Sequence, residues 1–138
     1  MLVEILFGSM GSGKSTYSAT FTEATVISQD RQGRKGHLRS YKQALTDKVE
    51  HIIIDRINHT RAQRKRYIDL AIEAGYRVKI TTFFVAYDEA LERILAREGH
   101  PTIPAGNLDI AMSALDMFFK HYEYPSDDEI PLVIEKPT

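Results

Sequence analysis

Short apolar runs alternate along the chain with longer segments in which apolar residues recur at helical spacing. Residues 2–7 form a mostly apolar run that ends at Gly8, and residues 51–54 form another that ends at Asp55. A short apolar run bounded by turn residues or an acid is typical of a strand that is buried on both faces. These two runs therefore predict central strands of a sheet.

Three further segments complete the predicted sheet. Residues 25–28 predict a second strand, and residues 77–85 predict another, because they are rich in the β-branched and aromatic side chains that favour strands. Residues 130–134 predict an edge strand, because an edge position tolerates the missing N–H of Pro131.

Helices are expected between these strands. Thr60 and Gln63 form a capping box that predicts a helix start, and Gly75 predicts its end. The glycine-containing segment 31–36 is expected to be a loop. The predicted helices cover about residues 14–21, 37–49, 61–74 and 88–98, and a last long helix carries Leu108, Ala111, Leu115 and Phe118 on one face.

Alternating strands and helices predict a parallel sheet between two helical layers. In such sheets, ligands bind beyond the carboxyl ends of the strands. Gly8, Asp30 and Asp55 each end or follow a predicted strand. We therefore expect these three positions to converge on one crevice.

The first strand is followed by the phosphate-binding pattern G-x-x-x-x-G-K-[ST]. Its glycines allow the backbone N–H groups to face phosphate oxygens at a helix N-terminus. Lys14 is expected to neutralise the β- and γ-phosphates of ATP, Ser15 to ligate Mg²⁺, and Thr16 to support the loop. The loop residues are Gly8, Ser9, Met10, Gly11, Ser12, Gly13, Lys14 and Ser15.

This motif sharpens the fold prediction. We expect an α/β P-loop NTPase/kinase three-layer sandwich, with a mostly parallel sheet of about five strands, flanking helices and a small helical lid. The 138 residues suit a single domain spanning 1–138. The motif does not identify the acceptor, because P-loop proteins include kinases, GTPases, motors and switches.

Composition limits the setting. The chain has no cysteine, which fits a reducing cytoplasm, and the sequence shows no apolar run of membrane-spanning length. The net charge of −1 is unevenly placed: residues 31–66 carry 11 Lys/Arg and three acids. This basic block indicates a polyanionic partner such as nucleic acid, or else two solvated helix faces.

The chain resembles the phage-type polynucleotide 5′-kinase family. The resemblance rests on residues 8–16, on Val26-Ile27-Ser28-Gln29-Asp30, on Ile53-Ile54-Asp55-Arg56-Ile57-Asn58-His59-Thr60 and on Arg93-Ile94-Leu95-Ala96-Arg97. It implies a kinase that moves the γ-phosphate of ATP to a 5′-hydroxyl end of DNA or RNA. Nothing in the chain suggests a second catalytic module, so a separate ligase or phosphatase partner is compatible with this prediction. The oligomeric state, including a homo-oligomer, is left open.

The resemblance assigns Asp30 as the general base that takes the proton of the acceptor hydroxyl. The alternative is a loop aspartate that caps a turn. The family also carries an arginine three residues later that grips an acceptor phosphate, and this chain has Gly33 there. Arg31 or Arg34 is expected to substitute for it.

Asp55 resembles the family's acid near the acceptor, and it equally fits the metal-side acid of P-loop enzymes. Backbone amides could also satisfy this carboxylate without any ligand. Asn58 is expected to contact the acceptor or to fix the loop that follows Asp55, and the alternative is a simple Asx-turn residue.

The resemblance implies that two arginines act on the triphosphate from a lid. Arg97 is predicted to stabilise charge on the transferring phosphoryl group, because a guanidinium can contact two oxygens at once. Arg93 is named as a second lid residue, although the sequence alone favours a surface pair with Glu89 at i,i+4.

Arg61 and Arg64, with Lys65 and Arg66, begin the helix after Asp55. They are expected to line the acceptor path and to contact nucleic-acid phosphates, although not all four can face the same way. Two rival functions remain: a small-molecule or nucleoside kinase, and a nucleotide-binding switch that hydrolyses ATP slowly.

Overall fold

The computed structural model describes residues 1–96, 107–129 and 133–134, except for the side chains of residues 30, 133 and 134. It confirms the predicted sheet. Five parallel strands lie in the order β2-β3-β1-β4-β5. Their bounds are β1 (Leu2–Gly8), β2 (Thr25–Ile27), β3 (His51–Ile54), β4 (Arg77–Phe83) and β5 (Val133–Ile134).

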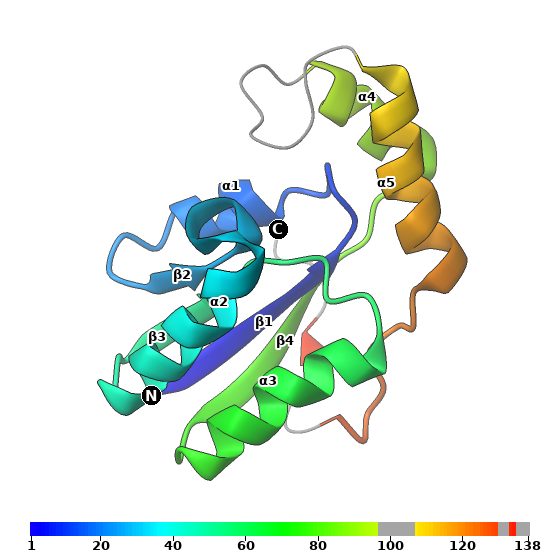
Figure 1. Cartoon of the computed structure of the whole chain (residues 1–138). Coiled ribbons are helices and arrows are strands. Elements are labelled where there is room, and N and C mark those ends of the chain that lie inside the picture. The colour runs from blue at the N-terminus through cyan, green and yellow to red at the C-terminus, as the bar shows by residue number, and fades with distance from the viewer. Residues whose placement is uncertain (97–106, 130–132, 135–138) are drawn as a thin grey trace.

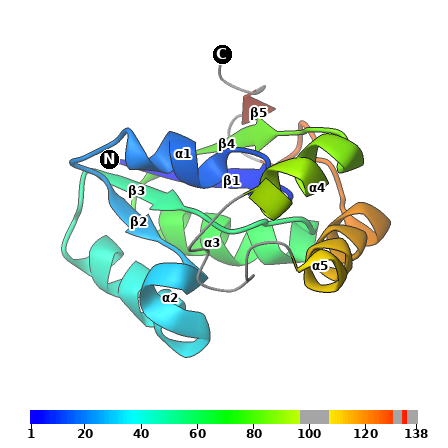
Figure 2. The ribbon, with the colours of Figure 1, turned by 90° about the horizontal axis from the view of Figure 1, so that it is seen from above.

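Helices cover both faces of this sheet (Figures 1 and 2). On one face, β1 packs against α2 and α3 through Val3, Ile5, Tyr41 and Tyr67. On the other face, α1 packs through Tyr17. The helices are α1 (Lys14–Ala19), α2 (Gln29–Thr46), α3 (Arg61–Glu73), α4 (Tyr87–Ala96) and α5 (Leu108–His121).

The helices α4 and α5 pair with each other beyond the loop end of the sheet. Their contact is apolar, with Ala90 and Ile94 of α4 against Ala111 and Leu115 of α5. Both views place this pair beside the loop that connects β1 to α1 (Figures 1 and 2). This is the position expected of a small helical lid over a phosphate loop.

The structure corrects the prediction of a loop at residues 31–36. Helix α2 begins at Gln29, with the Ser28 side chain capping it by accepting a hydrogen bond from the Arg31 N–H (3.1 Å). The helix is interrupted only at Gly33 (φ +80°, ψ 166°). Glycine adopts this backbone conformation readily, whereas other residues would be strained in it. Glycine therefore marks a kink here and not a loop.

A buried acid lies on the face of the sheet that α1 covers. Glu4 of β1 is fully buried and accepts hydrogen bonds from the hydroxyls of Tyr17 and Thr81, each at 2.6 Å. His51 contacts its other oxygen at 3.0 Å. Burial and the Glu4 carboxylate raise the pKa of the Tyr17 hydroxyl. This network satisfies the carboxylate within the core, so Glu4 has a structural role.

Within the described residues, no helix is long and apolar enough to cross a membrane.

Candidate active site

The phosphate loop between β1 and α1 depends on glycine at two crowded positions. A side chain at Gly8 would place its Cβ 2.5 Å from the backbone oxygen of Phe83. At Gly11, where φ is +78°, a Cβ would lie 2.7 Å from the backbone oxygen of Ala90. Gly13 caps α1 with φ +102°. These constraints hold the loop against β4 and α4, with its backbone turned toward the N-terminus of α1.

Polar groups of the loop are arranged as a cradle for an anion. The buried Lys14 ammonium donates to the backbone oxygen of Ser9 at 2.7 Å, which folds the lysine back over the loop. The buried hydroxyls of Ser9 and Ser12 have no hydrogen-bond partner within the described part of the chain. Because buried polar groups are normally paired, these hydroxyls fit a loop shaped for phosphate oxygens.

Asp55 lies directly beside the start of α1. Its Oδ2 accepts hydrogen bonds from the hydroxyls of Ser15 (3.0 Å) and Ser18 (3.1 Å). The Asp55 N–H donates to Ile27 O at 2.8 Å, which fixes the carboxylate beyond the ends of β2 and β3. Of the roles left open by the sequence, this contact favours the metal-side acid, because it joins the two groups expected to hold Mg²⁺.

The donor set fits Mg²⁺. Protein sites for Mg²⁺ usually supply one or two carboxylates and leave the remaining positions to phosphate and water oxygens. Ser15 and Asp55 would hold the ion, which supplies charge neutralisation for the phosphates when bound. Elsewhere in the described residues, no group of three or more His, Asp or Glu side chains gathers as a metal site.

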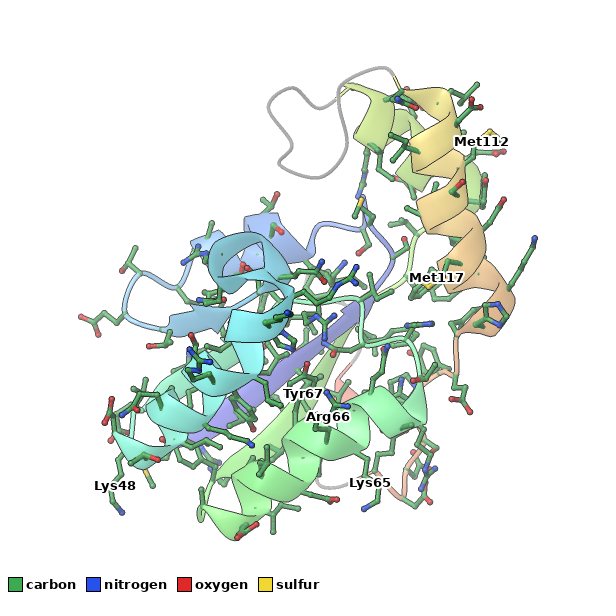
Figure 3. The ribbon with its side chains drawn as sticks, in the orientation of Figure 1. Lys48, Lys65, Arg66, Tyr67, Met112 and Met117 are labelled. Atoms are coloured by element: carbon green, nitrogen blue, oxygen red, sulfur yellow. The ribbon has the colours of Figure 1, made fainter. Side chains whose placement is uncertain are left out.

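A cavity of about 400 Å³ opens from the phosphate loop toward α2, α3 and α5. Its walls come from four parts of the chain that are distant in sequence. Met117 contributes from α5, and Figure 3 shows it lower on that helix than Met112. The lining residues are Met10, Gly11, Gly13, Lys14, Ser15, Gln29, Asp55, Arg56, Ile57, Asn58, His59, Gln63, Ala114 and Met117.

The predicted base lies next to this cavity in sequence. Asp30 is the second residue of α2, and its neighbour Gln29 lines the cavity wall. The structure describes the backbone of Asp30, while its side chain lies outside the described part. Its role as the base stays a prediction.

Four polar or charged residues of the cavity wall were not predicted from the sequence: Gln29, Arg56, His59 and Gln63. Arg56 and His59 stood within the segment that carried the family resemblance, so their position after a strand end was a usable signal. The buried ring of His59 leaves Nδ1 without a partner in the described structure. Burial is the main cause that lowers the pKa of His59, which favours its neutral form.

The structure corrects the role expected for Arg64. Its side chain is 0% exposed and does not line the cavity. Its Nε and Nη2 each donate to Glu129 at 2.8 Å, and Nη1 donates to the backbone oxygen of Asn58 at 2.9 Å. A guanidinium buried in this way cannot contact a nucleic-acid phosphate, so the prediction for Arg64 is wrong.

Arg61 does not line the cavity either. It forms a two-pronged ion pair with Asp128 and a hydrogen bond to Ser126. The Arg61 guanidinium lowers the pKa of Asp128 well below its usual range. Arg61 and Arg64 therefore tie α3 to residues 126–129 and do not form an acceptor path.

Asn58 is held by the main chain. Its backbone has φ +47°, and its amide nitrogen donates to Leu6 O at 2.7 Å and to Arg56 O at 3.1 Å. These contacts match the loop-fixing role that the sequence left open, although part of the residue also lines the cavity. Thr16 and Arg34 are both exposed and lie outside the cavity wall.

The lid arginines are only partly described. Arg93 donates to Glu89 at 2.8 Å, as its spacing on the helix predicts, and a second nitrogen reaches the backbone oxygen of Gly11 at 3.3 Å. Arg93 thus connects α4 to the phosphate loop. Arg97 lies outside the described residues, so its predicted role stays a prediction.

Comparison with models of known protein families shows which family the chain belongs to. The model of a family described as AAA domain matches residues 3–123. The chain belongs to the AAA domain family. Comparison with curated proteins gives no match. Membership in the AAA domain family fits the phosphate loop and the parallel sheet.

Solved structures share the fold of this AAA domain at low sequence identity. Kti12 of Chaetomium thermophilum, solved with ADP-AlF3, has a TM-score of 0.63 at 17% identity, covering 97% of this chain and 88% of Kti12. A protein of Chloroflexus aurantiacus described as a candidate kinase has a TM-score of 0.71 at 17% identity, with coverages of 98% and 86%. A Janibacter sugar kinase has a TM-score of 0.58 at 20% identity, with coverages of 97% and 84%. The chain thus has a P-loop kinase-like fold.

Proposed function

We propose that this protein is a polynucleotide 5′-kinase that transfers the γ-phosphate of ATP to the 5′-hydroxyl end of DNA or RNA, a reaction that serves nucleic-acid repair. The observation that carries the proposal is the arrangement of α2. Its first turn carries Gln29 at the cavity wall and Asp30 beside it, and the rest of the helix carries an excess of positive charge. One element therefore joins the predicted base to a basic surface.

The basic surface is continuous along one side of α2. Lys35, Arg39 and Lys42 follow one another at helical spacing and line a shallow hollow. No carboxylate in the described structure forms an ion pair with them, whereas Arg61 and Arg64 are neutralised by Asp128 and Glu129. After this correction, the basic block of the sequence is concentrated on α2. Such a surface suits the phosphates of a strand whose end enters the cavity.

The proposed chemistry uses few groups. Asp30 accepts the proton of the acceptor hydroxyl while the hydroxyl oxygen forms a bond to the terminal phosphorus of ATP. The bond from that phosphorus to the bridging oxygen breaks, and ADP is the leaving group. Lys14 and the loop N–H groups stabilise the negative charge, and Arg97 is proposed to assist from the lid. Kti12, which shares this fold, binds a nucleotide analogue, which supports ATP as the donor.

The test is transfer of labelled phosphate from ATP to oligonucleotides with 5′-hydroxyl ends. Single- and double-stranded DNA and RNA serve as acceptors, and free nucleosides and sugars serve as competing small molecules. We expect transfer to at least one oligonucleotide, with the rate reduced at least about 100-fold by Asp30→Asn and by Lys14→Ala. Transfer only to small molecules would replace the proposal by a small-molecule kinase. ATP hydrolysis that is insensitive to Asp30→Asn, without any transfer, would indicate a nucleotide switch.

The role of α2 has its own measurement. Oligonucleotide affinity should fall as salt rises, and replacing Lys35, Arg39 and Lys42 together by glutamine should flatten the log–log slope by roughly 2. The control is Arg77→Gln, an exposed change at the start of β4 outside the cavity, which should leave the slope nearly unchanged. An equal slope for the triple variant and wild type would show that the α2 surface is merely solvated.

A further inference from the structure

Helix α1 presents two serine hydroxyls to the same carboxylate oxygen. Ser15 and Ser18 lie three residues apart, which places them on one face of the helix. Both hydroxyls donate to Oδ2 of Asp55, at 3.0 Å and 3.1 Å. The phosphate-loop pattern accounts for Ser15, because this position is the one expected to ligate Mg²⁺. The pattern does not include Ser18, so the second contact calls for an explanation of its own.

The two serines differ in their access to the cavity. Ser15 is exposed and lines the cavity wall, whereas Ser18 is 2% exposed and is not part of the wall. A ligand that enters the cavity can therefore compete for the Ser15 hydroxyl but not for the Ser18 hydroxyl. The contact between Ser18 and Asp55 is thus the one expected to persist when the cavity is filled.

The carboxylate is the stronger of the two acceptors within reach of Ser18. The same hydroxyl lies 3.1 Å from the backbone oxygen of Ser15, which is a common local contact for a serine inside a helix. The hydroxyl has one hydrogen to give, and a bond to a charged oxygen is roughly twice as strong as a bond to a neutral one. At equal distances, the interaction with Asp55 is therefore favoured.

Asp55 depends on its side-chain contacts for orientation. Its N–H donates to the backbone oxygen of Ile27 at 2.8 Å, which fixes the main chain beyond the strand ends. This bond does not fix the side-chain torsions that aim the carboxylate. In the described part of the chain, the hydrogen bonds to the carboxylate come from Ser15 and Ser18. Once the oxygen of Ser15 is engaged by an ion, Ser18 is the residue that keeps the carboxylate in place.

We propose that Ser18 is a positioning residue for the metal-side acid: it holds Asp55 in the orientation that favours Mg²⁺ beside Ser15. Residues that orient metal-binding side chains in this way typically change metal affinity by roughly 10- to 100-fold. This inference rests on ATP and Mg²⁺ as the ligands of the proposed function, and it does not depend on the identity of the acceptor.

The experiment measures how much Mg²⁺ tightens nucleotide binding, with titration calorimetry and a non-hydrolysable ATP analogue. The readout is the magnesium factor, defined as the ratio of the dissociation constant in EDTA to that in excess Mg²⁺. We expect Ser18→Ala to reduce the magnesium factor roughly 10-fold. The dissociation constant in EDTA should stay within about twofold of wild type, because the phosphate loop itself is unchanged. A serine that only stabilised α1 would weaken binding equally in both conditions.

The matched control is Thr20→Ala. Thr20 is exposed at the end of the same helix, and its hydroxyl donates to the backbone oxygen of Tyr17, three residues earlier, at 2.7 Å. This variant removes the same kind of local contact as Ser18→Ala but does not touch Asp55. Its magnesium factor should therefore stay within about twofold of wild type.

A double-mutant cycle tests whether Ser18 acts through Asp55. In an Asp55→Asn background, Ser18→Ala should change the magnesium factor by less than about twofold, because the carboxylate that Ser18 orients is gone. Three results would overturn the inference: an unchanged factor in Ser18→Ala, an equal loss of affinity with and without Mg²⁺, or the same loss in both backgrounds. Wild-type binding that Mg²⁺ does not tighten would overturn it as well. Failure to phosphorylate any 5′-hydroxyl end would refute the proposed function, whereas this binding measurement needs no acceptor and would still decide the role of Ser18.

Discussion

The buried ion pair between Arg64 and Glu129 allows a quantitative prediction. Both side chains are almost fully buried, at 0% and 4% exposure, and the guanidinium also holds the backbone oxygen of Asn58. Removing one member of such a pair leaves a buried charge unpaired, which costs about 3–5 kcal/mol of unfolding free energy. We expect this cost for Arg64→Met, since methionine keeps much of the apolar stem but none of the charge.

The assay is equilibrium urea unfolding followed by circular dichroism, together with thermal melting. A loss of about 3–5 kcal/mol in a chain of this size lowers the melting temperature by roughly 10–20 °C. The double variant Arg64→Met/Glu129→Leu removes both charges, so it should recover most of the loss. Arg66→Met is the control on the same helix, with an exposed side chain, and should stay within about 0.5 kcal/mol of wild type.

Two outcomes would refute this reasoning. If Arg64→Met costs less than about 1 kcal/mol, the guanidinium is not isolated from water in the way that its burial implies. If the double variant is no more stable than the single one, the loss comes from packing or from the Asn58 contact and not from an unpaired charge. The interaction energy from the double-mutant cycle separates these explanations.

Three further predictions follow from the site. Gly11→Ala should cost about 1–3 kcal/mol of unfolding free energy and weaken ATP binding, because Gly11 has a positive φ and a Cβ there would clash with the backbone of Ala90. The control is Gly36→Ala, where the nearest atom to the added Cβ is 3.8 Å away, and it should be neutral or stabilising in the same urea assay. Asp55→Asn should reduce the gain in ATP affinity on adding Mg²⁺ by about 10-fold or more, measured by titration with Mg²⁺ and with EDTA; an unchanged gain would contradict the metal role. The pKa of His59 is lowered in the folded state, so as pH falls below about 6.5 the unfolded chain binds a proton at His59 more readily than the folded chain, and the free energy of unfolding decreases. The variant His59→Gln should lose less stability than wild type between about pH 7.5 and 5. Identical pH profiles of stability for the two proteins would contradict this.

The sequence predicted most of the sheet and the phosphate loop because their signals are local. Central strands in a parallel sheet are apolar on both faces, so runs such as residues 2–7 stand out. The loop follows a fixed pattern of glycines, which the structure explains by the crowding at Gly8 and Gly11. The start of α3 was predicted for the same reason: the Thr60 hydroxyl accepts from the Gln63 N–H.

The errors concern contacts between distant parts of the chain. Glycines indicated a loop at residues 31–36, but the cap at Ser28 and the packing of Tyr41 maintain a helix around the break. Arg64 was assigned to the acceptor because of its charge, although its spacing from Tyr67 and Ala71 places it on the buried face of α3.

The cavity wall was incomplete for a similar reason. Met117 and Ala114 come from α5, which is brought to the site by tertiary packing that leaves no short motif. Gln29 and Arg56 are adjacent to the two predicted acids, and their contact across 27 positions of sequence becomes visible only in the folded chain. The residues that complete the cavity wall are thus harder to predict than those of the phosphate loop.

The contact between Arg64 and Glu129 shows that the fold extends beyond the last residue of the family match. The family match ends at residue 123, whereas the partner of this buried cation and the fifth strand of the sheet both follow that point. A chain cut at residue 123 would keep every described residue of the cavity and still leave a guanidinium stranded in its core. Residues 124–129 and 133–134 therefore belong to the folding unit, and shortened versions used to study the site should extend past them.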